Sequence, residues 1–113
     1  MINRKRITAL HEDAMELVER ALMEREPARA RQWFLSAFEK ERNAAEMLAD
    51  AREEEPTRSV LYRSAATMAL DCRNYREADR LIQEGLSGNP PSEIADELEH
   101  LRERVRASKL ETA

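Results

Sequence analysis

Residues 59–92 read SVLYRSAATMALDCRNYREADRLIQEGLSGNPPS, and this stretch decides the fold class. Its apolar residues recur at steps of three and four, which is the spacing of one face of an α-helix. A first helix ends near Cys72, and Asn74 suits the N-cap of a second. That second helix must stop by Gly88, because Pro90-Pro91 cannot continue it. A short link makes sequence neighbours antiparallel, so the stretch predicts a helical hairpin.

The composition extends this prediction to the whole 113-residue chain. Glycine occurs only at Gly85 and Gly88, which we take to mark one helix end, and residues 1–84 have none. Sheets need glycine at tight turns and bulges, so a β fold is disfavoured. Ala, Glu, Arg and Leu, all strong helix formers, are the common residues. We therefore expect one all-α domain over residues 1–113, with residues 1–6 and 108–113 frayed.

Towards the amino terminus the pattern predicts two more helices. The first starts near Ile7, with Thr8 as a suitable N-cap, and stops near Glu26, since the residue before a proline resists helical geometry. Pro27 suits the first turn of the second helix. That helix keeps its apolar period to about Glu53, which makes it unusually long.

The rest of the chain completes a count of five helices. The run Glu53-Glu54-Glu55-Pro56 is a break, and Thr57 is expected to cap the third helix. The fifth helix starts at Pro91 or Ser92. The distal half of the second helix carries an apolar set that packs either within the chain or on a second copy: Ala44, Ala45, Leu48 and Ala51.

Charge and cysteine content exclude several classes of protein. The net charge is −4 and no extended basic excess exists, which disfavours a nucleic-acid backbone binder. Arg4, Lys5 and Arg6 form at most a small basic arm. Cys72 is the only cysteine, so an intrachain disulfide is impossible and a small buried filler is expected. Without an apolar run of membrane-spanning length, the chain is expected to be soluble and cytoplasmic.

Residues 59–92 resemble one tetratricopeptide repeat, a 34-residue helical hairpin. The positions that carry the resemblance are Tyr62, Ala65, Ala66, Ala69, Ala78, Ile82 and Pro90. A weaker copy spans about 11–42, where Ala30 corresponds to Ala78. These two alanines are 48 residues apart, and Arg42 stands where the family has proline. The resemblance implies a short right-handed array of stacked hairpins, with one degenerate repeat, a lengthened second helix and a C-terminal capping helix.

Proteins of this family bind partners in a groove lined by the first helix of each hairpin. The resemblance therefore implies a non-enzymatic adaptor or scaffold that binds a partner peptide or helix. The groove positions carried over are Glu12, Met15, Glu19, Leu22, Met23, Val60, Arg63, Thr67, Leu70 and Asp71. A carboxylate clamp is rejected because Glu19 and Asp71 would repel the ligand. Leu22 and Leu70 are equally compatible with the core.

Three alternatives complete the hypotheses. The first is a homo-oligomeric structural bundle that self-associates through the long second helix, and the second is a regulator whose Arg4–Arg6 arm touches nucleic acid. The third, an enzyme or metalloprotein, has little support, since His11 and His100 belong to no recognisable metal-ligand motif. We expect no cofactor, no metal and no membrane contact, and we expect a protein or peptide partner.

Overall fold

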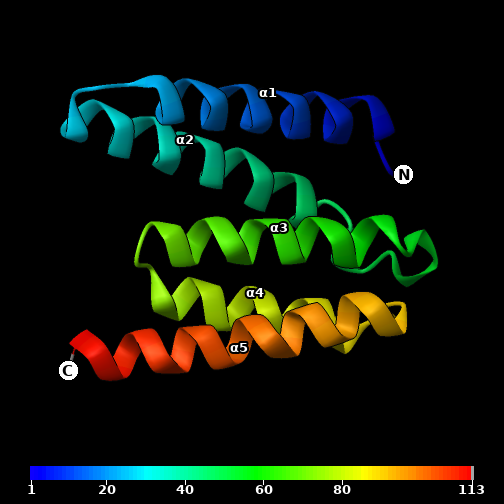
Figure 1. The fold of residues 1–113 in the computed structure, drawn as a ribbon. Coiled ribbons are helices and arrows are strands. Elements are labelled where there is room, and N and C mark those ends of the chain that lie inside the picture. Colours follow the sequence, from blue (N-terminus) through cyan, green and yellow to red (C-terminus); the bar gives the residue numbers. More distant parts are fainter. Residues whose placement is uncertain (113) are drawn as a thin grey trace.

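The computed structural model describes residues 1–112, and Figure 1 shows its helices in chain order. They are α1 (Arg4–Met23), α2 (Pro27–Glu46), α3 (Thr57–Asp71), α4 (Tyr75–Ser87) and α5 (Ser92–Thr112), with a 3₁₀ turn η1 (Arg52–Glu54) between α2 and α3. The described residues contain no strand, so the all-α prediction with five α-helices is confirmed. Residues 4–6 and 108–112 are helical, their fraying stays a prediction, and position 113 of the predicted domain lies outside the described residues.

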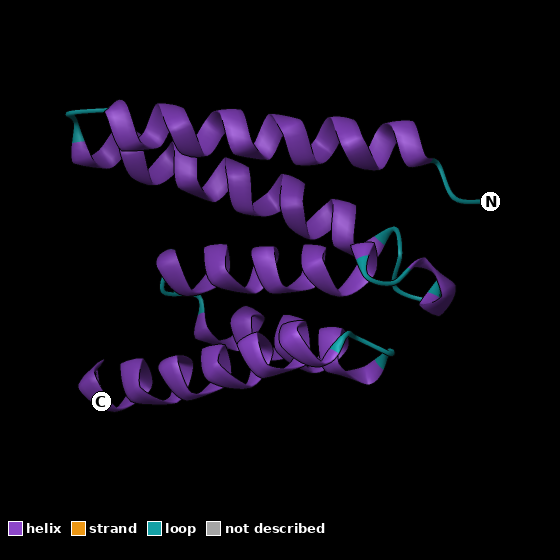
Figure 2. Cartoon of the chain, turned by 45° about the vertical axis from the view of Figure 1, so that its right-hand side comes forward, coloured by secondary structure: helices purple, strands orange, loops and turns teal. Residues whose placement is uncertain are grey.

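The helices stack as antiparallel hairpins in a slab of 41 × 34 × 20 Å (Figures 1 and 2). Helix α2 packs on α1 and on α3, and α3 packs in turn on α4 and α5. Within residues 1–112, α1 has α2 as its only close helical neighbour. The array therefore has α1 at one end and α5 at the other (Figure 1).

Small residues let the helices approach closely. Ten alanines and Gly85 are buried, eight of the alanines at 0% exposure, and they leave the space between helices to a few large side chains: Phe38, Tyr62, Leu81, Ile82, Leu98 and Val105. The expected role of Gly85 as a helix end is wrong, since α4 runs on to Ser87 and Gly88 is its C-cap. A Cβ on Gly85 would lie 3.1 Å from both Leu98 and Tyr62, so this glycine lets α3, α4 and α5 meet.

Side-chain caps define where the helices begin. Asn74 is confirmed as the N-cap of α4, its Oδ1 accepting a backbone N–H at 3.3 Å. Thr8 is wrong as the first cap, because Asn3 takes that role and accepts a backbone N–H of α1 at 3.0 Å. Thr57 is also wrong as a cap, since it is the first helical residue of α3. Glu55 instead accepts a backbone N–H of α3 at 2.9 Å.

Helix α2 ends at Glu46, so its predicted extension to Glu53 is wrong. The chain continues through tight i→i−3 turns over 47–51. The cause lies in the next helix: Arg58 Nε donates to the carbonyl oxygens of Leu48 (3.2 Å) and Ala49 (3.1 Å). The carbonyl of Leu48 also accepts from the N–H of Ala51 at 3.0 Å, whereas Arg58 supplies the donor for Ala49, so the arginine caps the end of this segment from outside.

Arg58 is buried, with 1% of its surface exposed. Its guanidinium lies 4.9 Å from the centre of the Tyr62 ring and about 4 Å from the carboxylates of Glu55 (4.0 Å) and Glu84 (3.9 Å). A Cβ at Gly88 would come within 2.5 Å of Nη1, so glycine there leaves room for the charge. One side chain thus joins the 47–56 connection, α3 and the end of α4.

Arg58→Met is expected to lower the free energy of unfolding by about 3 kcal/mol, because it leaves buried carbonyls and Glu55 without their cation. Urea unfolding followed by circular dichroism measures the change. Arg52→Met is the matched control, since Arg52 is exposed on η1. Equal midpoints for the two variants would show that Arg58 has no such structural role.

The apolar set on the distal part of the second predicted helix is buried within the chain. Ala44 and Ala45 are 0% exposed, and Leu48 and Ala51 belong to the same core cluster. Packing within the chain is therefore confirmed, and these residues are not available to a second copy. None of the helices in residues 1–112 combines the length and apolar character that crossing a membrane requires.

A buried carboxylate also joins α1 to α2. Glu41 is 0% exposed, and both of its oxygens lie near Nδ1 of the half-buried His11, at 2.9 and 3.0 Å. An ionised carboxylate only accepts hydrogen bonds, so Nδ1 carries the proton in this pair. His11 is the hydrogen-bond partner that offsets the cost of burying Glu41.

His11→Ala is expected to destabilise the protein by about 2 kcal/mol, because Glu41 stays buried without its partner. The double variant His11→Ala/Glu41→Met should recover much of that loss, since methionine needs no hydrogen bond there. Urea unfolding of the two single variants and the double variant measures the coupling. Strictly additive free-energy changes would contradict the pairing.

Candidate functional site: a groove over helix α3

Three adjoining hollows run across the exposed strip of α3, and together we call them the α3 groove. The central hollow, of about 320 Å³, lies between α3 and the α1–α2 hairpin. A second, of about 350 Å³, lies between α3 and α5 and shares Arg63 and Thr67 with the first. A third, of about 290 Å³, shares Phe34 and Asp71 with the first and extends towards Leu35. The shared residues make the surface continuous across four helices.

Helix α3 itself determines where this groove lies. Most of its circumference is buried against α2, α4 and α5, which leaves one strip of partly exposed side chains. Arg63, Thr67 and Asp71 follow each other at four-residue steps along that strip. The Thr67 hydroxyl donates to the carbonyl oxygen of Arg63 at 2.9 Å, which fixes its rotamer on the helix.

The lining combines an apolar floor with charged walls. Met15, Val18, Phe34 and Met68 provide apolar surface. On the α5 side Arg63 forms an ion pair with Glu97. Desolvation raises the pKa of Asp71, and the positive charge of Arg104 opposes the rise.

The lone cysteine lies at the far end of the groove. Cys72 is half-buried beside Leu35 and Phe34. Burial raises the pKa of its thiol, and the negative charge of Asp71 raises it further. The side chain therefore stays a neutral thiol at neutral pH. It packs against the core cluster but is only half-buried, so the expected buried filler is wrong in its degree of burial.

The structure brings together four of the predicted groove residues, Met15, Arg63, Thr67 and Asp71. Leu70 is wrong as a groove residue, because it is 8% exposed and belongs to the core. The remaining predicted positions lie outside the three hollows: Glu12, Glu19, Leu22, Met23 and Val60. Leu22, at 72% exposure, is not a core residue either.

Several lining residues were missed by sequence reasoning. Ser64 and Met68 are four residues apart and so form a second row beside that of Arg63 and Thr67, which borders the central hollow. Phe34 was not among the predicted groove positions, yet it lines two of the hollows. The wall from α5 had no signal, since the fifth helix was read as a cap: Glu97, His100 and Arg104. In residues 1–112 no three His, Cys, Asp or Glu side chains converge as a metal ion would require.

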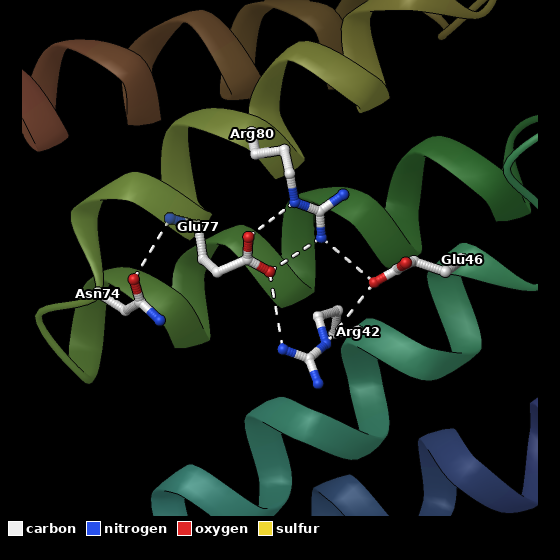
Figure 3. A network of polar contacts seen from close by, with 5 residues as sticks. All are labelled: Arg42, Glu46, Asn74, Glu77 and Arg80. Atoms are coloured by element: carbon white, nitrogen blue, oxygen red, sulfur yellow. Dashed lines mark hydrogen bonds and ion pairs between the residues drawn. The ribbon is translucent and has the colours of Figure 1, made fainter.

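A network of four charged side chains links the two hairpins (Figure 3). Arg80 on α4 donates to both carboxylate oxygens of Glu77 (2.7 and 2.9 Å) and to Glu46 on α2 (3.2 Å). Arg42 on α2 lies 3.6 Å from Glu46 and 3.7 Å from Glu77. Hydrogen bonds from Arg80 lower the pKa of Glu77, and the Glu77 carboxylate raises that of Arg80. The alternating charges hold α2 beside α4 and so fix the angle between the hairpins.

This network predicts an acid-sensitive contribution to stability. The pKa of Glu77 in the folded state lies below its ordinary value of 4.5. The contribution is therefore complete above that value and is lost as the pH falls through the lowered pKa. Glu77→Gln should destabilise the protein by about 1 kcal/mol at pH 7 and flatten its stability curve in acid.

Thermal unfolding of the wild type and of Glu77→Gln from neutral to acidic pH measures this difference. Glu53→Gln is the control, because Glu53 is exposed on η1 and forms no ion pair within residues 1–112. If all three curves run parallel, the lowered pKa of Glu77 does not contribute to folding.

Scans of the chain against protein-family models, curated proteins and solved structures found no significant match. The resemblance of residues 59–92 to a tetratricopeptide repeat therefore stays a prediction that rests on the residues quoted for it.

Proposed function

We propose that the chain is a non-enzymatic interaction module that binds a segment of a partner protein along the α3 groove. The supporting observation is the continuity of the groove: neighbouring hollows share residues from α3 at one junction and from α2 and α3 at the other. A surface of this length suits an extended or helical segment better than a compact small molecule. The expected cytoplasmic location stays a prediction.

The lining supports a partner with both apolar and polar residues. Met15 and Met68 are flexible and polarisable, so they adapt to apolar side chains of different shapes. Arg63, Thr67 and Asp71 form a polar line beside this floor. A complementary segment has apolar residues on one face and polar residues on the other, as an amphipathic helix has.

The basic-arm hypothesis has less support than the groove. Arg4 is part of the first turn of α1 and forms an ion pair with Glu54 of η1. Its charge is therefore already matched within the chain, which reduces what Arg4–Arg6 can offer a nucleic-acid backbone.

Thr67→Arg tests the groove, because Thr67 lines both the central and the α5-side hollows. The long side chain should obstruct both hollows and reduce partner recovery at least tenfold. The measurement is capture of proteins from a lysate of the source organism on immobilised wild type and variants, with circular dichroism to verify folding. A charged substitution at the predicted groove residue Leu70 cannot test the groove, because Leu70 is buried and Leu70→Asp would disturb the core.

Asn43→Arg is the matched control, because Asn43 is exposed on α2 and lines none of the three hollows. It should recover the same proteins as the wild type. Equal recovery by Thr67→Arg, or no recovery above bare resin by the wild type, would refute the proposal.

A further inference from the structure

A cavity of about 680 Å³ lies between α4 and α5, outside the α3 groove. Four cationic side chains line it together with Asp79 and Gln83, and we call it the basic cleft: Arg80, Arg102, Arg106 and Lys109. This concentration of positive charge occurs on a chain whose net charge is −4. The six lining residues carry a formal charge of +3, opposite in sign to that of the whole protein, although Arg80 is already paired with Glu77 and Glu46.

Three of these cations form one stripe along α5. Arg102, Arg106 and Lys109 are spaced at i, i+4 and i+7, so they share a face of the helix. Like charges at such spacings destabilise a helix by a few tenths of a kcal/mol each. Arg102 is paired with Glu99 (3.2 Å) and Lys109 with Asp79.

Arg106 is the exception in this stripe. Within residues 1–112 no carboxylate lies within ion-pair distance of it. An acidic residue at this position would pair with both Arg102 and Lys109 and would make α5 more stable. The stability of the single chain therefore does not explain why position 106 is an arginine, whereas an anionic partner bound in the cleft does.

The chain itself carries a matching acidic stripe. Glu12, Glu16 and Glu19 have the same i, i+4, i+7 spacing and are all exposed on α1. Helices α1 and α5 lie at opposite ends of the array, so the two stripes of one molecule do not meet (Figure 1). Two copies placed end to end bring them together.

We propose that the basic cleft binds the acidic stripe of α1 from a second copy of this chain. Each copy then offers one cleft and one stripe, so the contact is head to tail and continues the stack of helices from one molecule into the next. The contact leaves the α3 groove free, so self-association and partner binding are separate properties.

The opposing charges determine the strength of this contact. Glu16 already pairs with Arg20 at 3.1 Å, and Asp79 lies in the cleft. The Glu16–Arg20 and Lys109–Asp79 pairs are both exposed, and such pairs contribute between zero and about 1 kcal/mol to stability. Breaking them to form ion pairs with a second copy therefore costs little free energy. The association is consequently weak and sensitive to salt.

Sedimentation velocity over a concentration series tests the proposal. At about 0.02 M salt the mean mass should rise with protein concentration, and at about 0.5 M it should return to that of the monomer. Arg106→Glu and Glu16→Arg should each reduce the association constant at least tenfold. Arg106→Glu places an acid between Arg102 and Lys109, so this variant should keep its fold.

The decisive experiment restores the opposite charges at positions 106 and 16. The double variant Arg106→Glu/Glu16→Arg should regain self-association, because the reversed charges match again. An equimolar mixture of the two single variants should regain it for the same reason. Arg76→Glu is the control and should behave as the wild type, since Arg76 is exposed on α4 and lines neither the basic cleft nor the α3 groove.

A wild type that stays monomeric at low salt would overturn the proposal. The same holds if Arg76→Glu weakens association as much as Arg106→Glu does, which would indicate a response to net charge alone. Failure of both the double variant and the mixture to associate would show that the two stripes are not partners.

Discussion

The buried guanidinium of Arg58 is the interaction on which the arrangement of the hairpins depends. Its Nε donates hydrogen bonds to the carbonyl oxygens of Leu48 and Ala49, and its charge lies beside the carboxylates of Glu55 and Glu84. A buried charge is tolerated only where partners surround it, so the connection after α2, helix α3 and the end of α4 are constrained together. The position of α3 between α2 and α4 follows from this constraint.

The α3 groove is a consequence of that placement. Arg58 fixes the start of α3, and the Arg42–Glu46–Glu77–Arg80 network fixes the angle between α2 and α4. The strip of α3 that remains open then lies between α1 and α5. Neither anchor touches the groove, so changes at either one would alter its shape without changing its chemistry.

Local patterns in the sequence predicted much of the fold, and interactions between distant segments account for most of what they missed. Asn74 and Pro27 predicted their helix starts, because capping depends on a few neighbouring residues. The end of α2 was missed because Arg58, ten residues beyond Leu48, determines it. The resemblance to a tetratricopeptide repeat led to the prediction that Met15, Arg63, Thr67 and Asp71 share one groove, and these four residues do line one hollow. The burial of Leu70 and the wall from α5 depend instead on how α3 packs between its neighbours.

The single neighbour of α1 has a consequence for its dynamics. In a stacked array, an end helix separates by breaking one interface, whereas an inner helix must break several. The amide hydrogens of α1 should therefore exchange with solvent sooner than those of α3. Because α1 supplies Met15 and Val18 to the groove, a partner bound there would slow the exchange of an entire helix and not only of the residues that it contacts.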